Sequence, residues 1–363
     1  MNKLRKEFPV LSQNTYLNTA SSGLLYDSLL EYRQVHDLDF LIGGSTFRNK
    51  QSSFLNTVRQ SVGNFFECSS KDVILTQNFS LGLNTILHGL DTTKKVLLLD
   101  QDYPSVNFSF ISKGFNTCYA KVNVTMEQNI ETIIEEQKPD IFAFSLVQYI
   151  NGITIDLDFI KRIKTKYPNM LIIGDGTQFC GTTVFNFNNS GIDILGCSGY
   201  KWLLGGYGNG FLLFQPGIAE KISPELYKKS TKETDYDASY TSLRARFECG
   251  HMDTLNFGSL QYSLEFLSKI GLPVIEKKIQ KLANYAKEEF IKLDLLEKAV
   301  VQRKNHSSIF NIKGDNHLFN TLQDNNIITS LRGQGIRISI HFYNTKDDID
   351  RLLSILKNET TNL

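Results

Sequence analysis

The sequence has few cysteines, and they follow no regular spacing. The five are Cys68, Cys118, Cys180, Cys197 and Cys249, an odd number spread over 363 residues without a C-x-x-C pair. Such a set favours neither a disulfide framework nor a zinc site. We therefore expect a reducing compartment in which most of these thiols are small buried side chains, and we expect no metal centre.

Long apolar runs and an excess of one charge are also missing. No uninterrupted apolar run approaches the ~20 residues of a transmembrane helix, and residues 1–7 lack the apolar core of a signal peptide. The chain has 39 lysines and arginines against 38 aspartates and glutamates, so no strong field attracts nucleic acid or an anionic membrane. We expect a cytoplasmic protein that binds neither.

What the sequence does contain is an alternation of apolar runs and amphipathic segments. Unbroken apolar runs are typical of strands buried on both faces of a parallel sheet, and helices between them indicate an α/β fold. Expected strands cover residues 73–76, 95–99, 120–124, 140–146, 170–174, 192–197 and 211–214. Expected helices cover residues 28–66, with a break at Gly43–Gly44, then 127–137 and 157–167.

The last third of the chain has the pattern of a smaller α+β unit. Helices are expected from 257 to about 296 and near 317–322, strands at 308–312 and 336–341, and a last helix capped by Thr345. The polar stretch 223–242 before this unit is typical of a surface loop. A chain of this length favours two domains over one. We place a large domain at residues 15–248 and a small C-terminal domain at 249–363, with residues 1–14 a candidate to pack on the latter.

Lys201 is the first candidate functional residue. It follows the apolar run 192–197 and precedes the glycine-rich turn 205–210. A lysine at the end of a buried strand has a partly desolvated amine, which lowers its pKa and favours Schiff-base chemistry. An ordinary surface lysine before a loop is the alternative, and for this motif alone it is the commoner arrangement.

Asp175 is the second candidate, because the apolar run 170–174 delivers it to a strand end. A carboxylate on a buried strand is costly unless a cation meets it. A protonated pyridine nitrogen would do so, and an aspartate paired with that nitrogen is how proteins tune pyridoxal phosphate. The alternative is an aspartate that caps the next loop.

A candidate phosphate site follows the strand 73–76. Leu83, Ile86, Leu87 and Leu90 form one apolar helix face, with Ser80 placed to cap the helix. Free N–H groups and the positive end of the dipole at a helix start bind phosphate. The alternative is a cap and nothing more.

Two further stretches suit a ligand. Tyr103 follows a predicted strand and offers a ring that can stack on a flat cofactor, although loop packing explains a tyrosine beside a proline equally. Residues 19–23 are small, which suits a backbone that passes close to a ligand, although a plain polar turn is as common.

Taken together, these motifs resemble the class V aminotransferase family of fold type I pyridoxal-phosphate enzymes, which includes cysteine desulfurases, kynureninases and isopenicillin N epimerase-like proteins. The similarity runs from Tyr16 to the final helix in the family's order. It is strongest at Asp175-Gly176-Thr177-Gln178, at Ser198 to Lys201, and at Gly335 to Thr345. It implies a large domain with a mostly parallel mixed sheet between helices, a smaller α+β domain, and pyridoxal 5'-phosphate as cofactor.

The resemblance also implies roles at the cofactor. Lys201 would form the Schiff base with the cofactor aldehyde, Asp175 would keep the pyridine nitrogen protonated, and Gln178 would hydrogen-bond the phenolic oxygen. The implied phosphate and ring contacts are the backbone of Phe79 and Ser80, then Ser198, Tyr200 and Tyr103. Tyr200 and Tyr103 stand where the desulfurases have histidines, and Tyr200 still offers one hydrogen bond.

Substrate and partner contacts are implied in the same way. Arg337 would bind a substrate α-carboxylate through a bidentate fork. Arg332 shares its glycine-flanked loop and is a further candidate, with a solvated arginine as the alternative. Gln148 and Tyr149 lie in the region of a substrate-assisting asparagine in the desulfurases. His251 would reach the neighbouring subunit's phosphate site, which implies a homodimer with shared active sites.

One departure from the family separates its subgroups. Desulfurases carry a nucleophilic cysteine on a loop shortly before the carboxylate-binding arginine, because persulfide formation needs a thiolate. Here residues 329–334 read Thr-Ser-Leu-Arg-Gly-Gln, and no cysteine follows Cys249. The sequence therefore disfavours a cysteine desulfurase of the usual mechanism.

These inferences lead to a ranked set of functions. The first is a pyridoxal-phosphate-dependent aminotransferase acting on a small amino acid or an amino-sugar-like amine through Lys201. The second is a lyase that eliminates at Cβ or cleaves a C–S bond, or an amino acid epimerase. A non-catalytic binding module of the same fold is the third, but the presence of both Lys201 and Asp175 argues against it.

Overall fold

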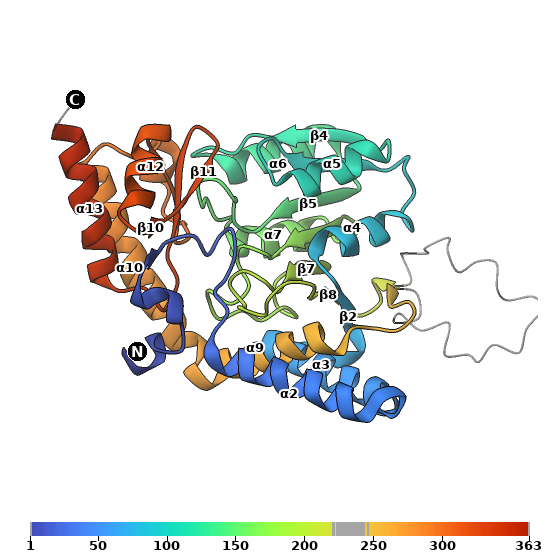
Figure 1. Cartoon of the computed structure of the whole chain (residues 1–363). Coiled ribbons are helices and arrows are strands. Elements are labelled where there is room, and N and C mark those ends of the chain that lie inside the picture. Colours follow the sequence, from blue (N-terminus) through green and yellow to red (C-terminus); the bar gives the residue numbers. More distant parts are fainter. Residues whose placement is uncertain (1, 220–221, 223–243, 245–246, 362–363) are drawn as a thin grey trace, which may run out of the picture.

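A seven-stranded sheet lies at the centre of the computed structural model, which describes all residues except 1, 220–221, 223–243, 245–246 and 362–363 (Figure 1). The strand order is β2-β8-β7-β6-β5-β3-β4. β7, β6, β5, β3 and β4 run parallel, while β8 is antiparallel to both β7 and β2. The strands are Val73–Thr76 (β2), Lys95–Leu99 (β3), Asn116–Ala120 (β4), Ile141–Ser145 (β5), Leu171–Asp175 (β6), Ile194–Ser198 (β7) and Gly210–Phe214 (β8). The predicted α/β class with a mostly parallel sheet is confirmed.

Both faces of this sheet are buried, which explains the unbroken apolar runs. Neighbouring residues of one strand, such as Leu97 and Leu98, belong to two different core clusters on opposite faces. α4 (Phe79–Leu87) and α5 (Pro104–Ser112) pack into one cluster. The other is covered by α3 (Gln51–Phe66), α6 (Met126–Gln137), α7 (Leu157–Lys166) and α9 (Thr254–Ile270), with α2 (Asp27–Gly43) outside α9 and the 3-10 helices η2 (Gly44–Lys50) and η3 (Ser70–Asp72) beside α3. The predicted break at Gly43–Gly44 is confirmed.

Two local predictions were wrong. The fourth strand is Asn116–Ala120 and not 120–124. It lies at the edge of the sheet and is only partly buried, with Asn116 and Tyr119 exposed, so the apolar run is missing. Ser80 does not cap α4: Asn78 does, because its side chain accepts a hydrogen bond from Leu81 N at 2.9 Å.

The C-terminal part forms a second layer of helices over a small sheet. The antiparallel sheet has the order β11-β12-β9, and β1 (Thr15–Tyr16) pairs in parallel with β10. The elements are α10 (Leu272–Lys292), α11 (Lys298–Gln302), β9 (Ile309–Lys313), α12 (Asn316–Asp324), β10 (Ile327–Ile328), β11 (Ser330–Arg332), β12 (Gly335–Ser339) and α13 (Lys346–Thr361). The chain begins with α1 (Asn2–Arg5) and η1 (Pro9–Ser12). The predicted α+β composition is confirmed.

The domain division at 248/249 stays a prediction. Two observations bear on how the parts meet: α9 packs on α2 and α3 beside the large sheet, and Arg5 forms an ion pair with Asp348 of α13. The predicted surface loop at 223–242 lies outside the described residues.

Asp348 is expected to stabilise the N-terminal end of α13. Its carboxylate accepts from Arg5 at 2.8 and 2.9 Å and from Thr345 N at 2.9 Å, while Thr345 Oγ1 accepts from Asp348 N. Replacing Asp348 by Ala removes the cap and leaves the Arg5 charge unpaired, so the free energy of unfolding should fall by about 3 kcal/mol. Thermal and denaturant unfolding measure this change. The exposed Asp347 in the same turn is the matched control, and Asp347→Ala should cost less than ~1 kcal/mol; equal losses would contradict the assignment.

Candidate active site

A cavity of about 530 Å³ opens at the carboxyl ends of the parallel strands. Parallel strands bring their carboxyl ends to one edge, so side chains from β5, β6 and β7 meet there. Its lining combines the ends of these strands, the start of α4, and the segments after β3 and β7. The lining residues are Asn78, Phe79, Ser80, Leu81, Tyr103, Ser145, Tyr149, Asp175, Thr177, Gln178, Ser198, Tyr200, Lys201 and Tyr207.

Lys201 is buried at one wall of this cavity, with 6% of its surface exposed. Desolvation lowers the pKa of its amine to about 8, although the nearby Asp175 carboxylate raises it. Nζ lies 5.6 Å from the centre of the Tyr103 ring and 5.5 Å from that of Tyr200. Within the described residues Nζ makes no hydrogen bond, so the amine is available to a ligand.

Asp175 ends β6 and is buried in the same cavity. Desolvation raises the pKa of its carboxyl to about 6, while hydrogen bonds from Thr177 and the charge of Lys201 lower it. Thr177 N donates to Asp175 Oδ1 at 2.8 Å. The carboxylate thus faces the cavity, and the hydrogen bond from Thr177 N holds its Oδ1 in place.

The start of α4 lies across from Ser198. Phe79 N donates to Ser198 Oγ at 2.9 Å, and Leu81 N donates to the capping Asn78 side chain. Between them, Ser80 N has no hydrogen-bond partner within the described residues. A free N–H at a helix N-terminus beside a serine hydroxyl suits a phosphate group.

The small residues 19–23 lie against the backbone of Lys201. Gly23 N donates to Tyr200 O at 2.8 Å, and a Cβ on Gly23 would lie 2.1 Å from Lys201 O, so only glycine fits there. The predicted close approach of this stretch to a ligand stays a prediction. Its described partner is the chain itself.

Arg337 is buried in β12 beside the cavity. Nη1 donates to Tyr149 O at 2.8 Å, and Nη2 donates to Ser21 Oγ at 2.6 Å. Desolvation and the charge of Arg332 lower the pKa of the guanidinium to about 10. Nε is buried and has no hydrogen-bond partner within the described residues, so the guanidinium retains a donor for an acceptor group.

Some predicted residues do not line the cavity. Gln148 is buried, with its side-chain Nε2 3.5 Å from Ser145 O. Arg332 is exposed and acts on Lys201 and Arg337 through charge alone. His251 is exposed and also lies outside the lining. The functional roles implied by the resemblance stay predictions for all the site residues.

Three lining or supporting residues had no clear sequence signal. Tyr207 lies on the turn after Lys201, stacked on Tyr200 at 5.0 Å between centroids, and its hydroxyl donates to Ser22 Oγ. Its neighbours Gly206 and Gly208 have φ of 71° and 82°, a signal of a sharp turn that does not say where the tyrosine points. Ser145 ends β5 and Thr177 lies two residues after β6, and a strand end by itself is too common a position to single them out.

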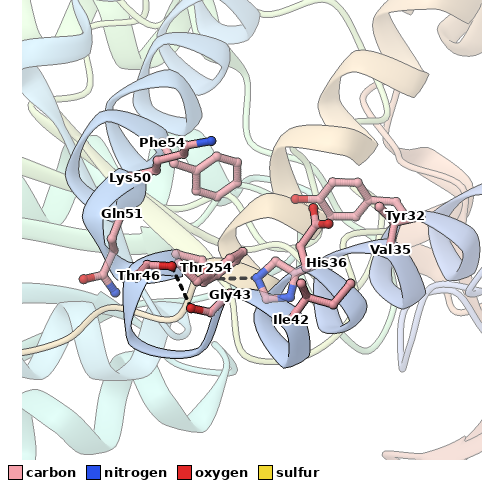
Figure 2. A pocket seen from close by; sticks show the side chains of 12 residues that line it. Tyr32, Val35, His36, Ile42, Gly43, Thr46, Lys50, Gln51, Phe54 and Thr254 are labelled. Carbon is pink, nitrogen blue, oxygen red and sulfur yellow. Dashed lines mark hydrogen bonds between the residues drawn. The ribbon is translucent and has the colours of Figure 1, made fainter.

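A second cavity, of about 520 Å³, lies between α2, η2, α3 and the start of α9 (Figure 2). None of its lining residues within the described chain belongs to the Lys201 cavity. His36 Nε2 lies 2.9 Å from Thr254 Oγ1, and Gln51 Nε2 donates to Met252 O. These contacts hold residues 252–254 against α2 and α3. Accordingly, neither this segment nor His251 lines the Lys201 cavity.

Within the part of the chain that the structure describes, no group of three or more histidine, cysteine, aspartate or glutamate side chains could hold a metal ion. Over the same residues, no helix is both long and apolar enough to cross a membrane.

A buried lysine and a buried aspartate at the ends of neighbouring parallel strands, facing one cavity, define a fold type I pyridoxal-phosphate site. The chain belongs to the class-V aminotransferase family, whose model matches residues 29–352. The family is pyridoxal-phosphate-dependent, so the predicted family, enzyme class and cofactor are confirmed. The free amine of Lys201, the carboxylate of Asp175 and the free N–H of Ser80 fit this cofactor.

Several relatives and solved structures are similar over nearly the whole chain. A probable cysteine desulfurase of Borreliella burgdorferi is 25% identical, covering 98% of this chain and 95% of its own. The uncharacterized aminotransferase YcbU of Bacillus subtilis is 22% identical, covering 98% and 97%. The apo cysteine desulfurase of Thermococcus onnurineus has a TM-score of 0.86 at 18% identity, covering 100% of this chain and 98% of its own. The cystine C–S lyase C-DES, in complex with its product cysteine persulfide, has a TM-score of 0.83 at 18% identity, covering 96% and 98%. The fold type I assignment is confirmed.

The lowered pKa of Lys201 predicts a pH profile for cofactor capture. Only the neutral amine attacks an aldehyde, so capture of pyridoxal phosphate by the cofactor-free protein should rise with pH through a midpoint near the amine's pKa of about 8 and then level. Borohydride trapping and peptide mass spectrometry at Lys201 measure the rate, with the exposed Lys71 as reference.

The sign of the Asp175 effect is part of this prediction. Its carboxylate raises the pKa of Lys201, so Asp175→Asn should move the midpoint to lower pH. A midpoint near the ~10.4 of a lysine in a model peptide, or a shift to higher pH in Asp175→Asn, would contradict the electrostatic account.

Proposed function

We propose that this protein cleaves the Cβ–S bond of a small sulfur-containing α-amino acid, with Lys201 as base and pyridoxal phosphate as cofactor. The observation that carries the proposal is the buried Lys201 amine, placed in one cavity with Asp175 and beside the half-satisfied guanidinium of Arg337. Names of relatives support the choice of bond, because several are probable cysteine desulfurases and a structural neighbour is a cystine C–S lyase.

When bound, the cofactor supplies an electron sink for the charge that develops at the substrate Cα. Asp175 favours this role by holding a proton on the pyridine nitrogen at the far end of the ring. Lys201 would take the Cα proton, and a pKa of about 8 suits a base near neutral pH. Ser80 N and Ser198 Oγ would hold the phosphate.

Arg337 orients the substrate. A carboxylate beside the guanidinium would accept from N–H donors that Tyr149 O and Ser21 Oγ leave free. This contact fixes the position of Cα relative to Lys201. Tyr103 and Tyr149, whose rings meet edge to face at 5.1 Å, close the cavity on this side.

The reaction balances with the amino acid and one water molecule as the reactants. The Cα–H bond breaks and its proton goes to Lys201, and the electron pair then expels the Cβ substituent as a thiolate. Because residues 329–334 contain no cysteine, the sulfur leaves in a free small molecule, as sulfide from cysteine or as a persulfide from cystine, and not as a persulfide on that loop. Hydrolysis of the remaining product gives a keto acid and ammonia.

Transamination of a small amino acid is the second candidate. The name of the YcbU relative favours it. The missing loop cysteine is also compatible with it, because transamination needs no thiolate and would use the same Lys201 as its base. The sequence ranked this reaction first. The homodimer with His251 at the partner's phosphate site, which the resemblance implies, and the cytoplasmic location also remain proposals.

A half-reaction screen distinguishes these outcomes. The cofactor-loaded protein is mixed with cysteine, cystine, alanine and serine, and products are identified. We expect pyruvate, ammonia and a released sulfur compound from cysteine or cystine, and none with Lys201→Ala. Pyridoxamine phosphate with a keto acid would support transamination in its place, and inverted substrate would support epimerisation. A protein that binds no pyridoxal phosphate would refute all three.

Arg337 is expected to matter only for substrates with an α-carboxylate. Arg337→Lys keeps the charge but loses the fork, so kcat/KM for the amino acid should fall about 100-fold or more, measured by product release. The same variant should leave the slower reaction of the matching decarboxylated amine within about 3-fold. Arg162, exposed on α7, is the control arginine. Equal losses on both substrates would show that Arg337 supports the fold and does not bind the carboxylate.

A further inference from the structure

Trp202 follows Lys201 directly and is the one tryptophan of the chain. Its side chain is 1% exposed and lies outside the lining of the Lys201 cavity. Its Nε1 donates a hydrogen bond to Gln178 Oε1 at 2.7 Å. Gln178 does line the cavity, so Trp202 reaches the ligand site through the glutamine.

This contact determines the orientation of the Gln178 amide group. An indole N–H can only donate, so the amide oxygen must face Trp202. The amide nitrogen in turn donates to Ala20 O at 3.0 Å. Both neighbours require the same orientation, because a flipped amide would set two donors against each other at Trp202 and two acceptors at Ala20.

The orientation limits what Gln178 can offer a ligand. Nε2 carries two hydrogens, and Ala20 O takes one of them. Oε1 is directed at the indole behind the cavity. Gln178 therefore presents an N–H donor to the cavity, and a donor favours an anionic oxygen over a hydroxyl.

We propose that Trp202 is a positioning residue that holds Gln178 as a hydrogen-bond donor to an anionic oxygen of the bound cofactor. The inference rests on the proposed function, which places pyridoxal phosphate in the Lys201 cavity. Of the cofactor's oxygens, the phenolic one, which the resemblance assigns to Gln178, would accept from this donor, and the contact would favour its ionised form. Trp202 thereby lowers the pKa of the chromophore without contacting it.

The indole is itself held from behind. His341 is fully buried, and its Nε2 lies 3.1 Å from Trp202 O, with the two rings 5.1 Å apart edge to face. Desolvation lowers the pKa of His341 to about 3, so the neutral ring donates from Nε2. Ala20 is fixed as well, because its N donates to Ser339 Oγ at 2.9 Å. Trp202 and Ala20, the two residues that orient Gln178, are therefore held in place by the protein itself before any ligand binds.

The first test uses the visible absorbance of the bound cofactor, titrated with pH. Trp202→Phe keeps most of the ring volume but removes the indole donor, so the titration midpoint should rise by about one pH unit. Gln178→Leu should raise it at least as far. If Trp202 acts through Gln178, the double variant should match Gln178→Leu alone.

The second test needs no cofactor. Because Trp202 is the one tryptophan, the fluorescence of the cofactor-free protein reports on it alone. Gln178→Leu removes the acceptor of the indole N–H and should shift the emission to shorter wavelength. Gln178→Glu keeps an acceptor oxygen, so its emission should stay near that of the wild type, while its absorbance midpoint still rises because the donor is lost.

Phe66→Leu is the control for packing, since Phe66 is a buried aromatic of α3 outside the Lys201 cavity; it should move neither spectrum. The proposal is overturned if Trp202→Phe leaves the midpoint unchanged, if the two single effects add in the double variant, or if Gln178→Leu leaves the emission unchanged. Failure of the wild type to bind pyridoxal phosphate would instead refute the proposed function, and the fluorescence result would still stand.

Discussion

The structure depends on keeping the Lys201 amine and the Asp175 carboxylate out of water in one cavity. Burial alone would neutralise both, since it lowers the pKa of a lysine and raises that of an aspartate. Here each charge partly offsets the burial of the other, which leaves Lys201 near 8 and Asp175 near 6. Both groups can therefore change protonation near neutral pH, as proton transfer requires.

The sheet makes this arrangement possible because β6 and β7 are adjacent and parallel, with Asp175 opposite Gly196. Their carboxyl ends bring Asp175 and Ser198 to the same edge, where α4 also begins. The backbone around Lys201 is then closed by Gly23, where no side chain fits. Gln178 joins these parts, since it contacts both Trp202 beside the lysine and Ala20 in the segment that also carries Ser21.

Much of the fold could be predicted from the sequence where strands are buried on both faces of the sheet. β5, β6 and β7 are central strands whose residues, apart from Asp175 at the end of β6, are apolar or small, so their runs are visible in the sequence. β4 was misplaced because an edge strand needs only one buried face. Within the site, Lys201 and Asp175 could be predicted as polar residues that end such runs. Tyr207 could not, because two flexible glycines flank it and its direction follows from the stacking on Tyr200.

The sequence by itself determined which chemical groups stand at the ends of buried strands, because apolar periodicity records burial and strand ends are local. The tertiary structure alone decided the strand order and the long-range contacts of the site. Arg337 meets Tyr149 and Ser21, and Trp202 orients Gln178, only after segments far apart in the chain have packed together. Such contacts leave no local pattern, since each partner's neighbours are compatible with many other surroundings.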